Sequence, residues 1–228
     1  MNKTLVITLF GGSLLLFVLF YVLSKVYYYK KHQIKYRFQQ MFPYEFNYPN
    51  VFKDNVFGNL LFLFALGFIV GFYFVFYNAE FFPKTATGLT TIIASIVLSM
   101  LFLCLLLMPL NYLRTHAIIS IFSTTISVAI PVINLLLAYQ VLQLYKSTSQ
   151  PIYLPIISMV VSGIMAILMI VLIFNPKATY KIYMDKTLDT EGNEVFIRPK
   201  IIYLALTEWW SIFTFFISPL ALILLIIN

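Results

Sequence analysis

Charged residues are scarce in this sequence. The 228 residues include 15 Lys and Arg and 8 Asp and Glu, or 10% of the chain, whereas a typical soluble domain carries about 25%. So few charged side chains cannot cover the water-facing surface of a soluble protein of this length. A soluble protein with a large buried helical core would need polar outer helices, and the sequence offers none.

Cysteine is almost absent, because Cys104 is the only one. A disulfide within the chain is therefore impossible. Cys104 lies inside the apolar stretch from Leu101 to Met108, where a thiol behaves as a small hydrophobic side chain.

Catalytic and nucleotide-binding motifs are also missing. The chain has no paired-histidine metalloprotease motif, no Walker loop and no GxGxxG pattern. Ser162 is not followed by any histidine, which argues against a serine protease arrangement. We therefore expect no enzymatic activity, no cofactor and no bound metal, and any energy from nucleotide hydrolysis would have to come from another chain.

Long hydrophobic runs are what the sequence does have. Hydrophobic residues make up 61% of the chain, and the charged residues leave six uncharged runs of 20 to 31 residues. About 20 apolar residues in a helix span the roughly 30 Å hydrocarbon core of a bilayer. The runs are Thr4 to Ser24, Asn55 to Ala79, Thr85 to Leu113, Thr115 to Tyr145, Ser147 to Pro176 and Trp209 to Asn228.

These runs predict a single all-α integral membrane domain with six transmembrane helices. A spanning segment must satisfy its own backbone hydrogen bonds, and runs without strict alternation exclude a β-barrel. The first run is too long for the apolar part of a signal peptide, so we expect it to be retained. The expected helices cover residues 4–26, 56–78, 87–110, 117–144, 152–175 and 207–227, and the two long loops are 27–55 and 176–206.

The distribution of Lys and Arg predicts which side of the membrane each loop faces. With six crossings, the first, third and fifth loops hold twelve basic residues, and the opposite side holds Lys3, Lys84 and Lys146. Cytosolic loops carry an excess of Lys and Arg. We therefore expect a multi-pass protein of the cell membrane, with both termini outside and the two long loops in the cytosol.

The first long loop concentrates positive charge next to a membrane span. Lys30, Lys31, Lys35 and Arg37 fall in a segment, Lys25 to Met41, whose apolar residues recur at helical spacing. This pattern predicts a basic amphipathic helix on the cytosolic leaflet, in contact with anionic lipid headgroups or with a partner protein. The contact with lipid explains the net charge of +7, and we expect no nucleic acid partner.

The stretch from Phe42 to Asn50 is dense in aromatic residues and contains two prolines. The preceding helix is expected to end before Pro43, because the residue before a proline favours an extended backbone. The stretch is then either an interfacial loop packed on lipid headgroups or a docking element for a partner.

The second run contains Gly67 and Gly71, which have the GxxxG spacing. This spacing lets two helix backbones approach closely. The contact is expected either within this chain or between subunits.

The fourth run has a polar face. Small polar or helix-bending residues recur there at spacings of four, three, four and three, namely Ser120, Thr124, Ser127, Pro131 and Asn134. We name this set the polar seam. An amide in hydrocarbon is costly unless it finds partners. The polar seam is either a packing face with hydrogen bonds between helices or the lining of a permeation or binding pathway. In both cases we expect Pro131 to bend the helix.

The last long loop contains a hairpin pattern. Residues alternate from Tyr180 to Asp185, and Val195 to Ile197 follow the turn residues Glu191-Gly192-Asn193. We expect a small cytosolic β-hairpin there.

Ionisable groups are absent from the six runs, apart from His116 near the start of the fourth. Proton-driven carriers and pumps use charged residues inside the membrane, so their scarcity argues against such a function. Glu208 is the one acidic candidate. Because it directly precedes Trp209 and Trp210, we expect a solvated carboxylate at the membrane interface.

Two functions fit these features. The first is a transport-related protein, a permease-like subunit or small facilitator acting with a partner chain, with the polar seam as its pathway. The second is a non-transporting accessory or scaffold protein that binds and positions other membrane proteins. In both cases we expect a further membrane or cytosolic protein subunit as partner, beside the lipid bilayer.

Overall fold

The computed structural model describes residues 3–47, 50, 53–78, 86–108, 113–148, 151–176, 185–188 and 194–226. Six helices within these ranges are long and apolar enough to cross a membrane, which confirms the predicted set of six apolar helices. They are α1 (Lys3–His32), α2 (Val56–Asn78), α3 (Ala86–Leu107), α4 (Leu113–Ser147), α5 (Tyr153–Ile173) and a sixth span made of α6 (Tyr203–Ile217) and α7 (Pro219–Leu224).

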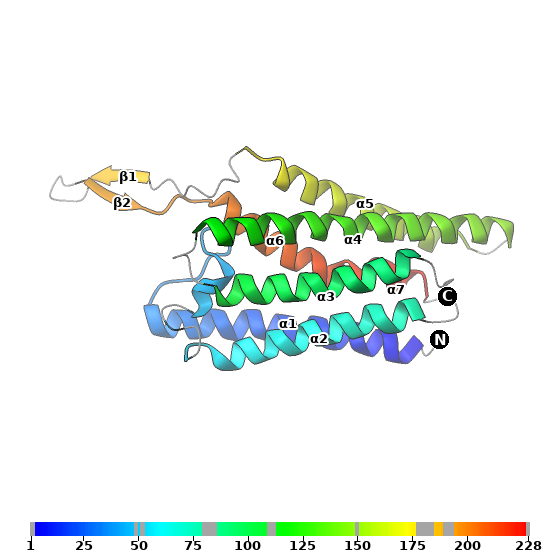
Figure 1. The fold of residues 1–228 in the computed structure, drawn as a ribbon, viewed down its shortest axis with the longest axis horizontal. Helices are drawn as coiled ribbons and strands as arrows, with labels where there is room; N and C mark the ends of the chain where they lie inside the picture. The colour runs from blue at the N-terminus through cyan, green and yellow to red at the C-terminus, as the bar shows by residue number, and fades with distance from the viewer. Residues whose placement is uncertain are drawn as a thin grey trace.

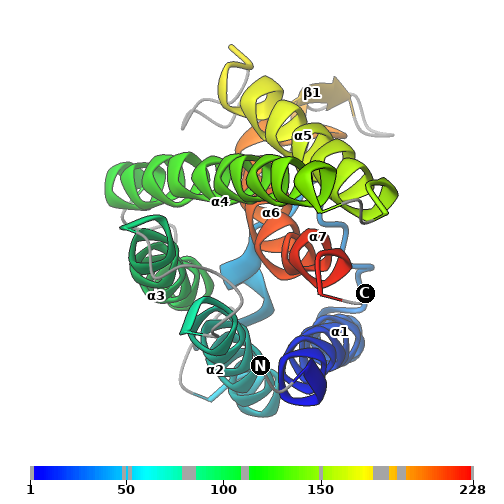
Figure 2. The same ribbon diagram turned by 90° about the vertical axis from the view of Figure 1, so that its right-hand side faces the viewer.

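The helices form an elongated bundle (Figure 1). Both termini lie at one end, which we name the termini end. The opposite end of the bundle carries the 3-10 helix η1 (Pro43–Asn47). We name this end of the bundle the plug end. Seen along the bundle, α6 and α7 lie inside, flanked by α1 to α4, and α5 packs against α4 (Figure 2). The sixth span is accordingly the most buried, with 72% of its most apolar stretch buried against 22–44% in the other five.

The sixth span contains a polar joint at Ser218, where α6 ends and α7 begins. Pro219 has no N–H, so the carbonyl of Phe215 loses its helical hydrogen-bond donor. The Ser218 hydroxyl lies 3.4 Å from that carbonyl oxygen and partly replaces the lost donor. The joint thus fixes a polar group inside the bundle.

Aromatic rings fill the space between α1, α2 and α6. Phe17 stacks on Phe216 with ring centroids 4.3 Å apart, and Phe20 packs against Phe62 at 4.7 Å. All four rings are buried. Between helices in lipid, close packing and hydrogen bonds hold the fold because lipid tails are as apolar as the side chains. The aromatic contacts therefore place α6 firmly against α1 and α2.

The first helix ends at His32, nine residues before the end of the expected basic helix at Met41. Gln33 has a φ of 57°, in the left-handed region, and the chain then turns back towards the bundle. Tyr36 and Met41, expected on the membrane surface, are buried instead. The expectation of one amphipathic helix is wrong over residues 33–41, because burial of aromatic side chains inside the bundle outweighs continuation of the helix.

Two short strands follow α5 in the chain. The strands β1 (Asp185–Leu188) and β2 (Glu194–Ile197) pair antiparallel, with Asp185 opposite Ile197 and Leu188 opposite Glu194. They project beyond the plug end of the helices (Figure 1). The first strand was expected from Tyr180 to Asp185, and residues 180–184 and the turn residues 191–193 lie outside the described residues. The cytosolic location of this hairpin stays a prediction.

The GxxxG pair does not mark the closest approach between helices of this chain. A Cβ atom on Gly67 would meet no heavy atom within 4 Å, and one on Gly71 would make an ordinary contact with Leu9 at 3.7 Å. The tight positions lie elsewhere on the same two helices. A Cβ on Gly12 of α1 would lie 2.7 Å from Cδ1 of Phe68, and one on Gly58 of α2 would lie 2.5 Å from Oγ of Ser24. The expectation of a close contact within the chain is therefore wrong for Gly67, and a contact between subunits stays a prediction.

Candidate functional site

The polar seam lies inside the bundle. Ser120, Thr124, Ser127, Pro131 and Asn134 are all buried, and α4 continues through Pro131 as an uninterrupted helix. The seam meets α6, since the Ser211 hydroxyl donates to Oγ1 of Thr124 at 3.2 Å. From residue 116 to residue 134 the helix rises by about 27 Å, close to the thickness of a hydrocarbon core. The polar face thus extends along most of the depth of a bilayer.

The joint at Ser218 connects three spans near the far end of the polar seam. The Asn134 amide nitrogen donates to the Ser218 carbonyl oxygen at 3.2 Å, and the Tyr73 hydroxyl of α2 lies 2.9 Å from Oγ of Ser218. The amide of Asn134 therefore finds one partner, as an amide in an apolar bundle requires. Its Oδ1 has no hydrogen-bond partner among the described residues.

The other end of the seam carries a histidine and a glutamate in direct contact. Nε2 of His116 lies 2.8 Å from Oε1 of Glu208, and both side chains are 0% exposed. We name these two residues the buried pair. The sixth span begins at Tyr203, so Glu208 belongs to a helix that can cross a membrane.

The buried pair corrects two expectations. Glu208 is not solvated, and the spans do contain ionisable groups, so the argument against a proton-driven carrier loses its basis. The physical reason is the position of Trp209. This side chain is packed in the core of the bundle and not at a lipid interface, and it holds the neighbouring glutamate inside as well.

The buried pair can hold a proton. A charge in a water-excluding interior is costly, so the favoured states are those without net charge. There are two such states: an imidazolium beside a carboxylate, and a neutral imidazole beside a carboxylic acid. Each of them holds one proton more than the state in which the glutamate is ionised and the histidine is neutral. Nδ1 of His116 and Oε2 of Glu208 have no hydrogen-bond partner in the part of the chain that the structure describes. The pair therefore has free capacity to exchange that proton.

Residues 36–47 fold over the buried pair, and we name this segment the plug. The rings of Phe42 and Tyr44 meet the His116 imidazole edge-to-face, with centroids 5.5 and 5.6 Å away. All residues from Met41 to Asn47 are buried. The two interpretations of the Phe42 to Asn50 stretch, a loop on lipid headgroups or a docking element, are therefore wrong for residues 42–47, which lie inside the bundle.

Trp209 anchors the plug from within. Its Nε1 donates to the Met41 carbonyl oxygen and to the Tyr36 hydroxyl, both at 3.0 Å. The Tyr36 hydroxyl in turn donates to the Phe42 carbonyl oxygen at 2.7 Å, and its ring stacks on Phe46 at 4.0 Å. One tryptophan next to Glu208 thus connects the sixth span to both halves of the plug.

An ion pair closes the plug at its outer edge. The Arg198 guanidinium, in the segment before α6, donates to the Glu45 carboxylate at 2.8 Å, and Oε1 of Glu45 accepts from the Phe42 N–H at 2.9 Å. Burial raises the pKa of the Glu45 carboxyl, and the Arg198 charge opposes that rise. The plug is therefore held to the lead-in of the sixth span by a charged contact as well as by Trp209.

A small cavity lies beside the polar seam. It has a volume of about 50 Å³ and is lined by Ser120, Ile121, Thr124, Ile173, Leu204 and Thr207. A cavity of this size accommodates one or a few water molecules. It is too small for an organic solute.

The four basic residues named from the sequence separate into two environments. Lys31 pairs with Asp54, and this hydrogen bond lowers the pKa of the Asp54 carboxyl. Lys30, Lys35 and Arg37 line a groove of about 500 Å³ on the outside of α1. The structure does not bring these residues to the buried pair or to the polar seam.

Two patterns in the sequence indicate the buried pair. His116 precedes Ser120 by four residues, so it extends the polar seam by one helical turn. On the last span, Thr207, Ser211, Thr214 and Ser218 recur at spacings of four, three and four, which gives that helix a polar face beside Glu208.

Comparison of the chain with protein-family models, with curated proteins and with solved structures gave no match. The function is therefore inferred from the geometry of the site.

Proposed function

We propose that the chain is a multi-pass protein of the cell membrane with a transport-related function, in which the buried pair and the polar seam form a proton path. In this proposal both termini lie outside and the plug end faces the cytosol. The protein acts as a permease-like subunit or small facilitator together with a partner chain. The buried pair, at one end of a polar face about 27 Å long, is the observation that carries the proposal.

Polar atoms without partners support a function beyond packing. Among the described residues, Oγ of Ser127, Oδ1 of Asn134 and Oε2 of Glu208 are buried and lack a hydrogen bond. Each such atom costs roughly 1–3 kcal/mol of stability. A face used only to join helices would be more stable with apolar side chains or with every polar atom paired. Ionisable groups inside a membrane are by default candidates for a functional site, and ion pathways and proton relays are among the known cases.

The size of the site favours a proton as the transported species. The cavity of about 50 Å³ beside Ser120 and Thr124 admits water but no larger solute. Hydroxyl groups both donate and accept hydrogen bonds. Side chains one helical turn apart lie about 5–6 Å from each other, so a proton relay along the seam includes water molecules between the hydroxyls. Pro131 also removes the helical donor to the Ser127 carbonyl, which adds a free acceptor near the middle of the seam.

Proton flux in reconstituted vesicles tests this proposal. The purified chain is placed in proteoliposomes that contain a pH-sensitive dye, and a potassium gradient with valinomycin imposes a negative potential inside. We expect the lumen to acidify faster than in protein-free vesicles. Glu208→Gln should reduce the added flux at least tenfold, because the amide cannot take up a proton.

The control is Glu45→Gln, which changes another buried carboxylate, one that lies in the plug and not in the seam. This variant should retain flux or increase it, since it weakens the contact with Arg198. Wild-type vesicles with no more flux than protein-free vesicles would contradict a proton path.

The accessory function is a second candidate, supported by a different observation. The β-hairpin projects beyond the plug end (Figure 1). The groove lined by Lys25, Lys30, Lys35 and Arg37, which we name the basic groove, is formed by the last turns of α1 and the residues after it, at the same end. A partner can reach both. If this function holds, neutralising Lys30, Lys31, Lys35 and Arg37 together should release a co-purifying partner. Ser127→Val with Asn134→Leu should leave that partner bound.

A further inference from the structure

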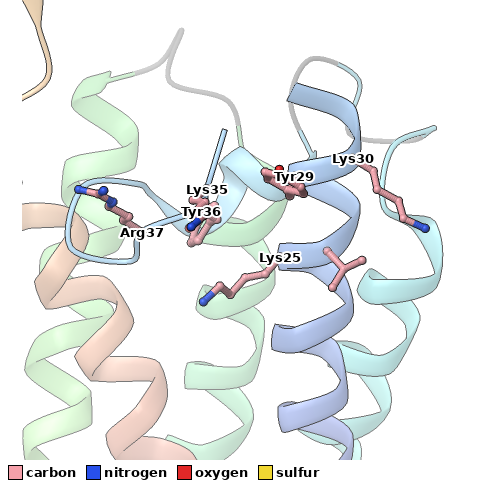
Figure 3. Close-up of a pocket in the computed structure, with 7 residues that line it drawn as sticks. Lys25, Tyr29, Lys30, Lys35, Tyr36 and Arg37 are labelled. Atoms are coloured by element: carbon pink, nitrogen blue, oxygen red, sulfur yellow. The ribbon is translucent and has the colours of Figure 1, made fainter. Parts of the chain in front are cut away.

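The basic groove lies where α1 leaves the bundle at the plug end (Figure 3). It is lined by Lys25, Val26, Tyr29, Lys30, Lys35, Tyr36 and Arg37 and has a volume of about 500 Å³. Lys25 is 22 residues after the start of α1, which corresponds to about 33 Å of helix. In a membrane with a hydrocarbon core of about 30 Å, the groove therefore lies at the level of the headgroups.

Three positive charges face the same side of α1. Figure 3 shows Lys25, Lys35 and Arg37 on one side of the helix, whereas the Lys30 side chain points to the other side. The Lys25 ammonium also lies over the Tyr21 ring, 5.2 Å from its centroid. Three cations around one concave surface favour an anion with more than one acceptor oxygen, such as a phosphate.

An apolar stripe continues from the groove along α1. Val18, Val22 and Val26 follow one another at spacings of four, and each side chain is exposed. Tyr29, three residues further, is exposed too and forms part of the groove wall. A ligand that fits both parts has an anionic head and a long apolar chain.

We propose that this groove binds one anionic phospholipid, with its phosphate among Lys25, Lys35 and Arg37 and an acyl chain along Val18, Val22 and Val26. This inference goes beyond the proposed function and does not depend on a proton path. General attraction to an anionic membrane depends only on the net charge of the protein. Binding in the groove depends on three particular basic residues on one side of α1 and on the apolar stripe beside them.

Native mass spectrometry of the delipidated full chain tests the proposal. The protein is titrated with phosphatidylglycerol or with phosphatidylcholine of identical acyl chains. We expect one phosphatidylglycerol to bind at least tenfold more tightly than phosphatidylcholine. Lys25→Gln, Lys35→Gln and Arg37→Gln together should weaken phosphatidylglycerol binding roughly 100-fold, with each charge contributing a several-fold factor.

A control variant with the same net charge separates a site from general attraction. Lys53→Gln, Lys146→Gln and Lys200→Gln remove three exposed charges outside the groove and should leave the affinity within about twofold. An equal loss in this control, or equal binding of the two lipids by the wild type, would overturn the proposal. Competition with glycerol phosphate tests whether the groove binds a whole lipid or only a phosphate. Glycerol phosphate should not displace phosphatidylglycerol, and displacement at equal concentration would contradict a contact with the acyl chain.

Discussion

His116→Leu is expected to lower the free energy of unfolding by about 3–5 kcal/mol, because it breaks a buried pair. The leucine removes the imidazole whose Nε2 lies 2.8 Å from the Glu208 carboxylate. That carboxylate must then remain buried as an unpaired charge or take up a proton at a free-energy cost. Reversible unfolding in mixed detergent micelles measures the change.

A double substitution tests whether the loss comes from the unpaired partner. His116→Leu with Glu208→Leu removes both ionisable groups, and we expect it to recover most of the stability lost in the single variant. His32→Leu is the matched control, because that histidine is partly exposed and contacts the Tyr28 ring, with ring centroids 4.5 Å apart. Equal stability of His116→Leu and wild type would contradict the burial of the pair.

Trp209→Ala is expected to cost about 3–5 kcal/mol, because a fully buried indole leaves a large cavity. The substitution also removes the donor to Met41 and Tyr36, so the plug loses its inner anchor. We therefore expect chymotrypsin to cleave the plug at its aromatic residues in this variant and to leave the wild-type plug intact. Unfolding in micelles and limited proteolysis measure the two effects.

The neighbouring tryptophan supplies the control for this prediction. Trp210 is 37% exposed and contacts Phe213 edge-to-face at 6.0 Å, so Trp210→Ala should cost only roughly 1 kcal/mol. Trp209→Phe keeps the ring but loses the Nε1 donor, and its cost should lie near 1–3 kcal/mol. If Trp209→Ala and Trp210→Ala destabilise equally, the anchoring role of Trp209 is wrong.

The sequence alone predicted the six spans because their signal is strong and local. Each uncharged run contains enough apolar residues to cross a membrane, and this property does not depend on the rest of the fold. The polar seam was recognised for a similar reason, since the helical spacing of Ser120, Thr124 and Ser127 places them on one face. Whether that face lines a pathway or joins helices depends on which residues of other helices lie opposite it. The sequence of one helix does not reveal those residues.

The plug was not predictable because aromatic residues occur both in membrane interfaces and in protein cores. Tyr36 and Phe42 occupy a stretch whose composition is typical of a headgroup belt, yet both are buried. What decides their position is Trp209, 173 residues after Tyr36 in the chain, through a hydrogen bond that no local pattern reveals. The same long-range contact explains why Glu208 was expected at the interface.

The crossing number and the orientation of the bundle are the premises of the proposed function, and sided cysteine labelling tests them most directly. In a Cys104→Ser background, the single variants Lys53→Cys, Lys200→Cys and Lys146→Cys are exposed to a membrane-impermeant maleimide in intact cells. We predict labelling of the position at residue 146 in intact cells, and of positions 53 and 200 only after permeabilisation. Labelling of positions 53 and 146 from the same side would contradict the six-span arrangement.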